Sequence, residues 1–129
     1  EMPRKYAVLR QFAQDFDRLL TEAEGAFSRL KASPAPSQPE IVALFRPIHS
    51  LKGICGMLEE TKLLVRAFHR LEDVLPPLLP MRAVPRGKEK PVSASEWIQL
   101  GEATFRMARE VERIFQAKIE LWRKLGADE

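Results

Sequence analysis

Apolar residues recur at intervals of three and four along the first quarter of the chain, and charged residues occupy many of the positions between them. This spacing is typical of a helix that buries one stripe of its surface. The pattern predicts a first helix over about residues 3–32. Its buried stripe is expected to contain Val8, Phe12, Phe16, Leu19, Leu20, Ala23, Phe27 and Leu30.

A proline-rich loop at residues 33–39 is expected to separate the first helix from a second over about residues 38–57. Ser37, with Glu40 three residues later, is a capping-box signal, in which each residue satisfies a backbone donor at the start of a helix. The expected inner face of this helix consists of Ile41, Leu44, Phe45, Ile48 and Leu51.

Two more amphipathic helices are predicted, over about residues 60–76 and 94–125, with a second proline-rich loop at 76–92 between them. Gly126 is expected to end the last helix, because glycine readily adopts the left-handed backbone that follows many helices. The apolar positions are Leu64, Ala67, Phe68, Leu71, Val74 and Leu75, then Trp97, Leu100, Thr104, Phe105, Ala108, Val111, Phe115, Ile119 and Trp122.

Four helices with one apolar stripe each, and no segment with a period of two, predict an all-α fold, an up-down-up-down four-helix bundle. We expect residues 1–129 to form a single domain, because the chain is too short for two ordinary ones. The loop at 76–92 carries an excess of basic residues. It is expected to be a solvated connector, with a contact to an acidic partner as the alternative.

The composition narrows the classes of function. No apolar run approaches the roughly 18 residues of a membrane-spanning helix, so no membrane insertion is expected. The one cysteine, Cys55, excludes an internal disulfide framework, and it is expected to be a small buried residue in a cytoplasmic protein. A net charge of +3 is too small for a dedicated nucleic-acid-binding protein. A basic bundle that binds nucleic acid is therefore the weakest alternative.

Candidate chemistry centres on the first of only two histidines. His49 follows the core residue Ile48, so its side chain should point about 100° away from the buried stripe and be accessible. Lys52 and Gly53 lie three and four residues later and share its face of the helix. A neutral imidazole is a good nucleophile, an ammonium stabilises phosphoryl oxygens, and a glycine admits a close approach. The three residues together suit phosphoryl transfer.

The second histidine, His69, shares a face of the third helix with Glu72. If that face turns toward the second helix, Glu72 can accept a hydrogen bond from one ring nitrogen of His49 and leave the other nitrogen free to attack. Taken alone, the pair is an ordinary surface pair. A metal site is not expected, because His69 and Glu72 supply only two ligands. No cofactor-binding motif is present in the sequence.

Two segments carry a resemblance to a known family. FRPIHSLKGICGML, from Phe45 to Leu58, and FHRLEDVL, from Phe68 to Leu75, resemble a histidine-containing phosphotransfer (HPt) domain. They are most similar to the N-terminal phosphoacceptor domain of CheA-type chemotaxis kinases. The specific core of the match is HSLKG, which starts at His49.

The resemblance implies a role for each matching residue. His49 would be the phosphorylated residue, and Lys52 would lie near the phosphoryl group. Gly53 and Gly56 match the small residues of the family, and His69 with Glu72 matches a hydrogen-bond network around the acceptor ring. Such domains accept a phosphoryl group from an ATP-binding histidine kinase domain and pass it to an aspartate of a response-regulator receiver. They have no ATP site, so no independent enzymatic activity is expected.

Two departures from the family pattern keep an alternative open. Pro47 lies inside the second helix, which it is expected to kink, and the spacing from His49 to Glu72 is one residue longer than in CheA-like domains. The alternative is a docking or dimerisation module that keeps the fold without being phosphorylated. Because the chain ends after the fourth helix, we also expect a piece excised from a longer kinase.

Overall fold

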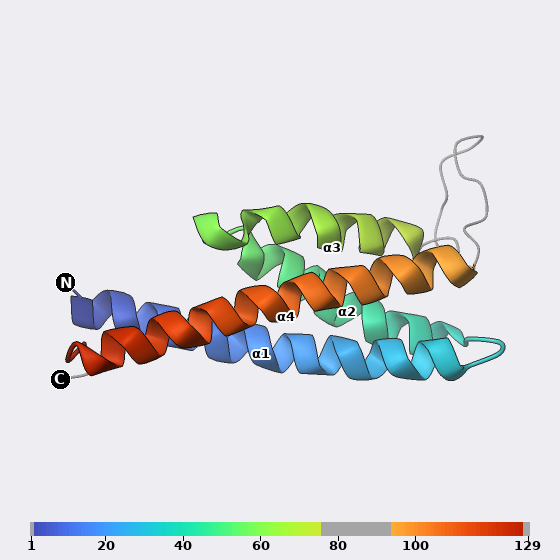
Figure 1. The fold of residues 1–129 in the computed structure, drawn as a ribbon. Coiled ribbons are helices and arrows are strands. Elements are labelled where there is room, and N and C mark those ends of the chain that lie inside the picture. Colours follow the sequence, from blue (N-terminus) through green and yellow to red (C-terminus); the bar gives the residue numbers. More distant parts are fainter. Residues whose placement is uncertain (1, 76–93, 128–129) are drawn as a thin grey trace.

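The computed structural model describes residues 2–75 and 94–127, and within these ranges the chain is helical, without strands (Figure 1). The elements are α1 (Met2–Ala32), α2 (Gln38–Cys55), the 3₁₀ turn η1 (Glu59–Thr61), α3 (Lys62–Val74) and α4 (Ala94–Lys124). Successive α-helices run in opposite directions (Figure 1). The predicted up-down-up-down bundle is confirmed.

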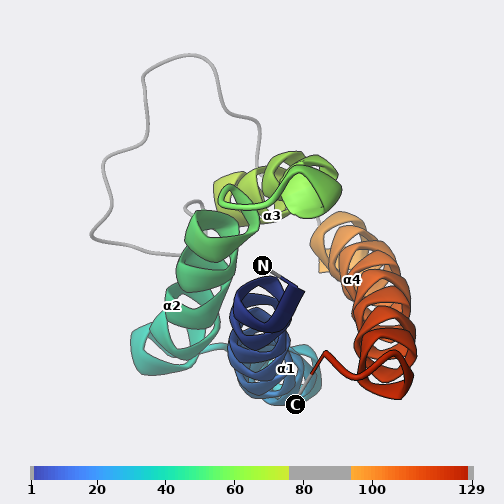
Figure 2. The same ribbon diagram turned by 90° about the vertical axis from the view of Figure 1, so that its left-hand side faces the viewer.

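The four helices enclose one apolar core. Helix α1 packs against α2 and α4, and α3 packs against the same two helices from the other side (Figure 2). Side chains that are less than 2% exposed fill the interior, among them Phe16, Leu20, Ile48, Leu51, Phe68 and Leu71. Within the described ranges, no helix has the length and apolarity needed to cross a membrane.

One expected core residue is on the surface. The side chain of Val8 is 58% exposed, whereas Tyr6 and Leu9 are buried. The buried stripe of α1 runs through Leu9 and Phe12, and Val8 lies about 100° around the helix from Leu9. The prediction that Val8 belongs to the core stripe was therefore wrong, because Val8, although four residues before Phe12, lies at the edge of the stripe, where the surface is exposed.

Helix α2 begins with the predicted capping box. The backbone N–H of Glu40 donates to Oγ of Ser37 at 3.4 Å, and the backbone N–H of Ser37 donates to Oε1 of Glu40 at 2.9 Å. The helix then runs without interruption past Pro47, which is buried on its inner face. It ends at Cys55, two residues earlier than expected, because the N–H of Gly56 turns back to the carbonyls of Gly53 and Ile54.

The connection from α2 to α3 is tighter than the sequence suggests. Residues 59–61 form η1, so α3 begins at Lys62 rather than at residue 60. The hydroxyl of Thr61, which is fully buried, donates to the carbonyl oxygens of Cys55 at 2.7 Å and Leu58 at 3.1 Å. Helix α3 ends at Val74, and the expected loop at 76–92 lies outside the described residues.

Helix α4 approaches α1 closely at Gly101. A Cβ atom on Gly101 would lie 2.3 Å from the ring of Phe27, so this position tolerates no side chain without movement of that ring. The far end of α4 is capped as predicted by Gly126, at a φ of 84°. The N–H of Ala127 donates to the carbonyl of Trp122, which is the bond of a Schellman cap.

Candidate functional site

His49 lies on the outer face of α2, with its side chain 65% exposed, although its neighbour Ile48 is fully buried. Its ring stacks on Phe45 one turn earlier, with 6.1 Å between the ring centroids and 9° between the planes. The expectation of an accessible imidazole is confirmed. The aromatic contact to Phe45 was not anticipated, since Phe45 was assigned only to the inner face.

Glu72 of α3 joins His49 to Lys52. Its Oε2 lies 2.8 Å from Nδ1 of His49, and its Oε1 accepts a hydrogen bond from Nζ of Lys52 at 2.7 Å. The carboxylate side chain is only 7% exposed, so the network is shielded from water on the side of Glu72, whereas the ring of His49 is open to solvent. The longer spacing between His49 and Glu72 therefore does not keep the two side chains apart, since the turn through η1 brings α3 alongside α2.

The surroundings of Glu72 favour its ionised form. Burial alone would raise the pKa of this carboxyl group, but hydrogen bonds from Lys52 and His49, together with the charge of Lys52, hold the pKa below its ordinary value. An ionised carboxylate can only accept, so Nδ1 of His49 must carry the proton and donate it. In the neutral ring, Nε2 then holds the lone pair.

His69 lies beside this group and does not touch the ring of His49 directly. Its Nδ1 accepts a long contact of 3.5 Å from Nζ of Lys52, and its Nε2 lies 3.4 Å from a carboxylate oxygen of Asp73. The side chain is 55% exposed. The structure thus places His69 at the outer edge of the network, connected to His49 only through Lys52 and Glu72.

The two glycines of the motif differ in their surroundings. A Cβ on Gly53 would meet nothing within 4 Å, whereas one on Gly56 would contact the carbonyl oxygen of Gly53 at 3.5 Å. Gly53 is thus an open position on the surface beside His49, and Gly56 is the cap of α2. Cys55 between them is fully buried, and burial raises the pKa of its thiol to about 12. This confirms its expected role as a small buried residue.

Two residues that support the site escaped the sequence analysis. Thr61 fixes the turn that sets α3 against α2, and its hydrogen bonds join groups that only the folded turn brings together. Phe45 supports the ring of His49, and its position four residues earlier is a signal that could have been used. Within residues 2–75 and 94–127, no three ligating side chains gather in a way that could hold a metal ion.

The site thus consists of an exposed histidine on the second helix of an antiparallel four-helix bundle, with one ring nitrogen held by a buried carboxylate of the third. The Hpt domain family matches residues 7–117, which is most of the chain. The chain therefore belongs to the Hpt domain family, whose role is histidine phosphotransfer in a phosphorelay. No curated protein and no solved structure matches the chain.

Proposed function

We propose that His49 carries the phosphoryl group, through Nε2. The observation that supports this most directly is the 2.8 Å contact between its Nδ1 and the buried Glu72. The lone pair of Nε2 attacks the γ-phosphorus of ATP, and the bond from phosphorus to the bridging oxygen breaks as ADP leaves. A carboxylate oxygen of an acceptor aspartate later attacks the same phosphorus, and the electrons of the breaking P–N bond return to Nε2.

The neighbouring side chains have distinct roles in this proposal. Glu72 orients the ring and stabilises the positive charge that develops on it as Nε2 attacks. Lys52 holds Glu72 ionised and adds positive charge near the phosphoryl group, with His69 against its ammonium. Gly53 and Gly56 leave the surface beside the ring low enough for a partner to approach.

Hpt domains work with kinases and response regulators in two-component relays. For this chain we propose an ATP-binding histidine kinase domain as donor and a receiver aspartate as acceptor. The similarity of HSLKG and its surroundings to CheA-type sequences supports a place in a cytoplasmic, CheA-like chemotaxis kinase, of which this chain is one domain. The protein itself then binds no cofactor and acts only as the carrier.

The alternative of a docking module without phosphorylation rested on two features of the sequence. Helix α2 continues through Pro47, and Glu72 reaches His49 despite the longer spacing. Neither feature now favours the alternative, and we retain phosphotransfer as the function.

Labelling with donor kinases tests the proposal. The protein is incubated with radiolabelled ATP and candidate histidine kinase domains, and the product is tested for a phosphate that acid releases and alkali does not. We expect the label in the native protein and in His69→Gln, and its loss in His49→Gln. Stable labelling of His49→Gln would contradict the proposal.

A small phosphoryl donor removes the dependence on a cognate kinase. Phosphoramidate transfers its phosphoryl group to imidazole nitrogen with ammonia as the leaving group. If His49 is as nucleophilic as proposed, phosphoramidate alone labels it, and it does so faster than it labels His69. A protein that phosphoramidate leaves unlabelled at His49 would instead favour the docking module.

A further inference from the structure

The free nitrogen of His49 faces a different set of residues from the network around Glu72. On a helix, Phe45 and Lys52 lie about 40–60° to one side of His49, and Arg46 and Gly53 lie by similar angles to the other side. Nδ1 points to the first side, since it contacts Glu72. Nε2 is the ring nitrogen farther from the backbone, and its lone pair points away from the Nδ1–H bond, outward from the helix and toward the side of Arg46 and Gly53 rather than toward Glu72.

The two cations nearest to His49 on α2 differ in their availability. The ammonium of Lys52 is committed to Glu72 at 2.7 Å, and its side chain is only 23% exposed. Arg46 is exposed and has no ion pair or hydrogen bond within residues 2–75 and 94–127. The unpaired positive charge on this helix is therefore on the Nε2 side of the ring, one turn before His49.

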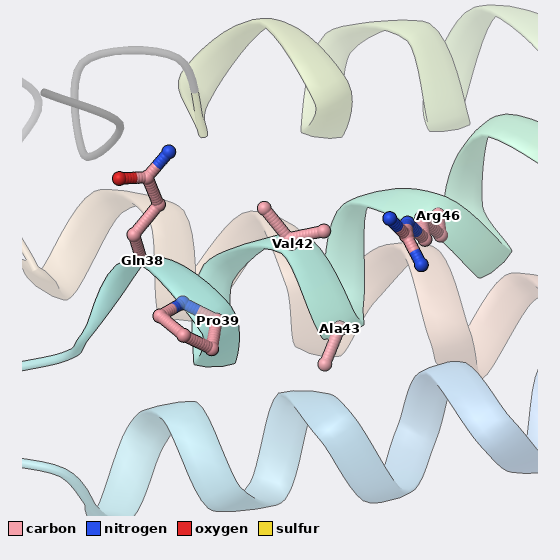
Figure 3. A pocket seen from close by; sticks show the side chains of 5 residues that line it. All are labelled: Gln38, Pro39, Val42, Ala43 and Arg46. Atoms are coloured by element: carbon pink, nitrogen blue, oxygen red, sulfur yellow. The ribbon is translucent and has the colours of Figure 1, made fainter. Parts of the chain in front are cut away.

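A shallow hollow gives the arginine side chain room to move. The side chains that line this hollow all come from the outer face of α2: Gln38, Pro39, Val42, Ala43 and Arg46 (Figure 3). The volume of the hollow is about 500 Å³. None of these five residues is acidic. On the other flank of Nε2, the bare surface of Gly53 leaves space for the phosphoryl oxygens.

From this arrangement we propose that Arg46 binds the phosphoryl group while it is bonded to Nε2 of His49, and that Lys52 acts chiefly through Glu72. The proposal rests on phosphorylation of His49. A guanidinium suits the task, because it remains charged and presents two parallel N–H donors to phosphoryl oxygens. Residues three apart on a helix lie about 5–6 Å apart at Cβ, which is within the reach of an arginine.

The test measures the second ionisation of the phosphoryl group itself. The native protein, Arg46→Gln, Arg46→Lys and Lys52→Gln are phosphorylated with phosphoramidate and titrated by ³¹P NMR at low ionic strength, where charge effects are least screened. Arg106→Gln is the matched control, because Arg106 is an exposed arginine on α4, across the bundle from α2 (Figure 2).

Loss of a cation about 4 Å from the phosphoryl group should raise its pKa by about 0.7 units in water-like surroundings. We expect that rise in Arg46→Gln, a smaller rise in Arg46→Lys, and no change in Arg106→Gln. An unchanged titration in Arg46→Gln, with a rise in Lys52→Gln, would overturn the assignment to Arg46 and leave the function intact. A native protein that accepts no phosphoryl group at His49 would overturn both proposals.

Discussion

The carboxylate of Glu72 makes hydrogen bonds to two residues of another helix, and both depend on its charge. Its pKa is lowered from an ordinary value of about 4.5, because the bonds from Lys52 and His49 outweigh the cost of burial. A carboxyl group with a lowered pKa stabilises the fold fully above its ordinary value. That contribution is lost as the pH falls through the lowered value in the folded state.

Replacement of this carboxylate gives the first prediction. At about pH 7, Glu72→Gln should unfold at a lower urea concentration, with a loss of about 1–2 kcal/mol, the size expected for hydrogen bonds between charged groups. The difference from the native protein should shrink as the pH falls below about 4.5. Glu22→Gln, which removes an exposed carboxylate from α1, is the control and should show neither effect. A difference that stays constant with pH would show that the charge of Glu72 does not stabilise the fold.

Only some properties of the individual site residues could be predicted from the sequence. The exposure of His49 follows from its place after Ile48, because helical phase alone determines it. The contact between His49 and Glu72 could not be predicted from helical phase alone, since it depends on how Thr61 closes the turn between α2 and α3. Val8 was wrongly assigned to the core for a different reason. At the edge of an apolar stripe, a valine is equally compatible with the core and with the surface.

Two helical glycines lie in opposite surroundings. Gly101 of α4 lies against the ring of Phe27, which is itself packed against Trp97 and Phe105. Gly53 of α2 has open space where its Cβ would be. Glycine inside a helix costs about 1 kcal/mol relative to alanine. Packing against α1 offsets that cost at Gly101, whereas nothing in the described fold offsets it at Gly53.

Alanine substitutions at Gly101 and at Gly53 give the next prediction, in which each variant is the control for the other. Gly101→Ala should destabilise the protein by about 1–3 kcal/mol, because a ring held in the core must move. Gly53→Ala should stabilise it by up to about 1 kcal/mol and slow phosphoryl transfer from kinase to receiver, because the added methyl group stands where the partner approaches. Urea unfolding and transfer rates measure the two effects. If Gly53→Ala transferred phosphoryl groups at the native rate, close approach at this position would lose its support.

At the scale of elements, the capping motifs correctly predicted the helix ends that they mark. The capping box at Ser37 and the glycine cap at Gly126 act through local hydrogen bonds, so they can be read from a few residues. The end of α2 and the start of α3 shifted by about two residues, because η1 forms in a stretch whose pattern also suits an α-helix.

Across the whole molecule, Arg109 ties α4 to α1. Its guanidinium donates to Asp17 at 2.7 Å, to the Oγ1 of Thr21 at 3.0 Å and to both carboxylate oxygens of Glu24. The hydrogen bonds that Arg109 donates to Glu24 raise the pKa of its guanidinium against the cost of partial burial, with a further contribution from Asp17. One side chain thus bridges residues more than eighty positions apart in the sequence.

Removal of this bridge should affect the stability of the whole bundle. Arg109→Ala is expected to lose about 1–2 kcal/mol, since the two carboxylates are partly exposed and return to water rather than remaining buried. Arg109→Lys should retain part of the stability, because an ammonium cannot reproduce the planar set of donors. Thermal unfolding of Arg109→Ala at the native midpoint would contradict this account of how α4 is held.

The bundle as a whole was predictable because every helix shows its own apolar stripe. The long-range contacts of Arg109 were not, because charged residues at exposed positions look alike in the sequence until the rotation of each helix is known. The same limit applies to Arg46, whose significance depends on which nitrogen of His49 is engaged by α3.

The central claim, that Glu72 holds Nδ1 and leaves Nε2 to react, is tested most directly by NMR of the phosphorylated protein. With ¹⁵N-labelled histidine, coupling between phosphorus and nitrogen identifies the bonded atom. We predict coupling to Nε2 of His49, with a proton retained on Nδ1. Phosphorus on Nδ1 of His49, or on a nitrogen of His69, would contradict the account.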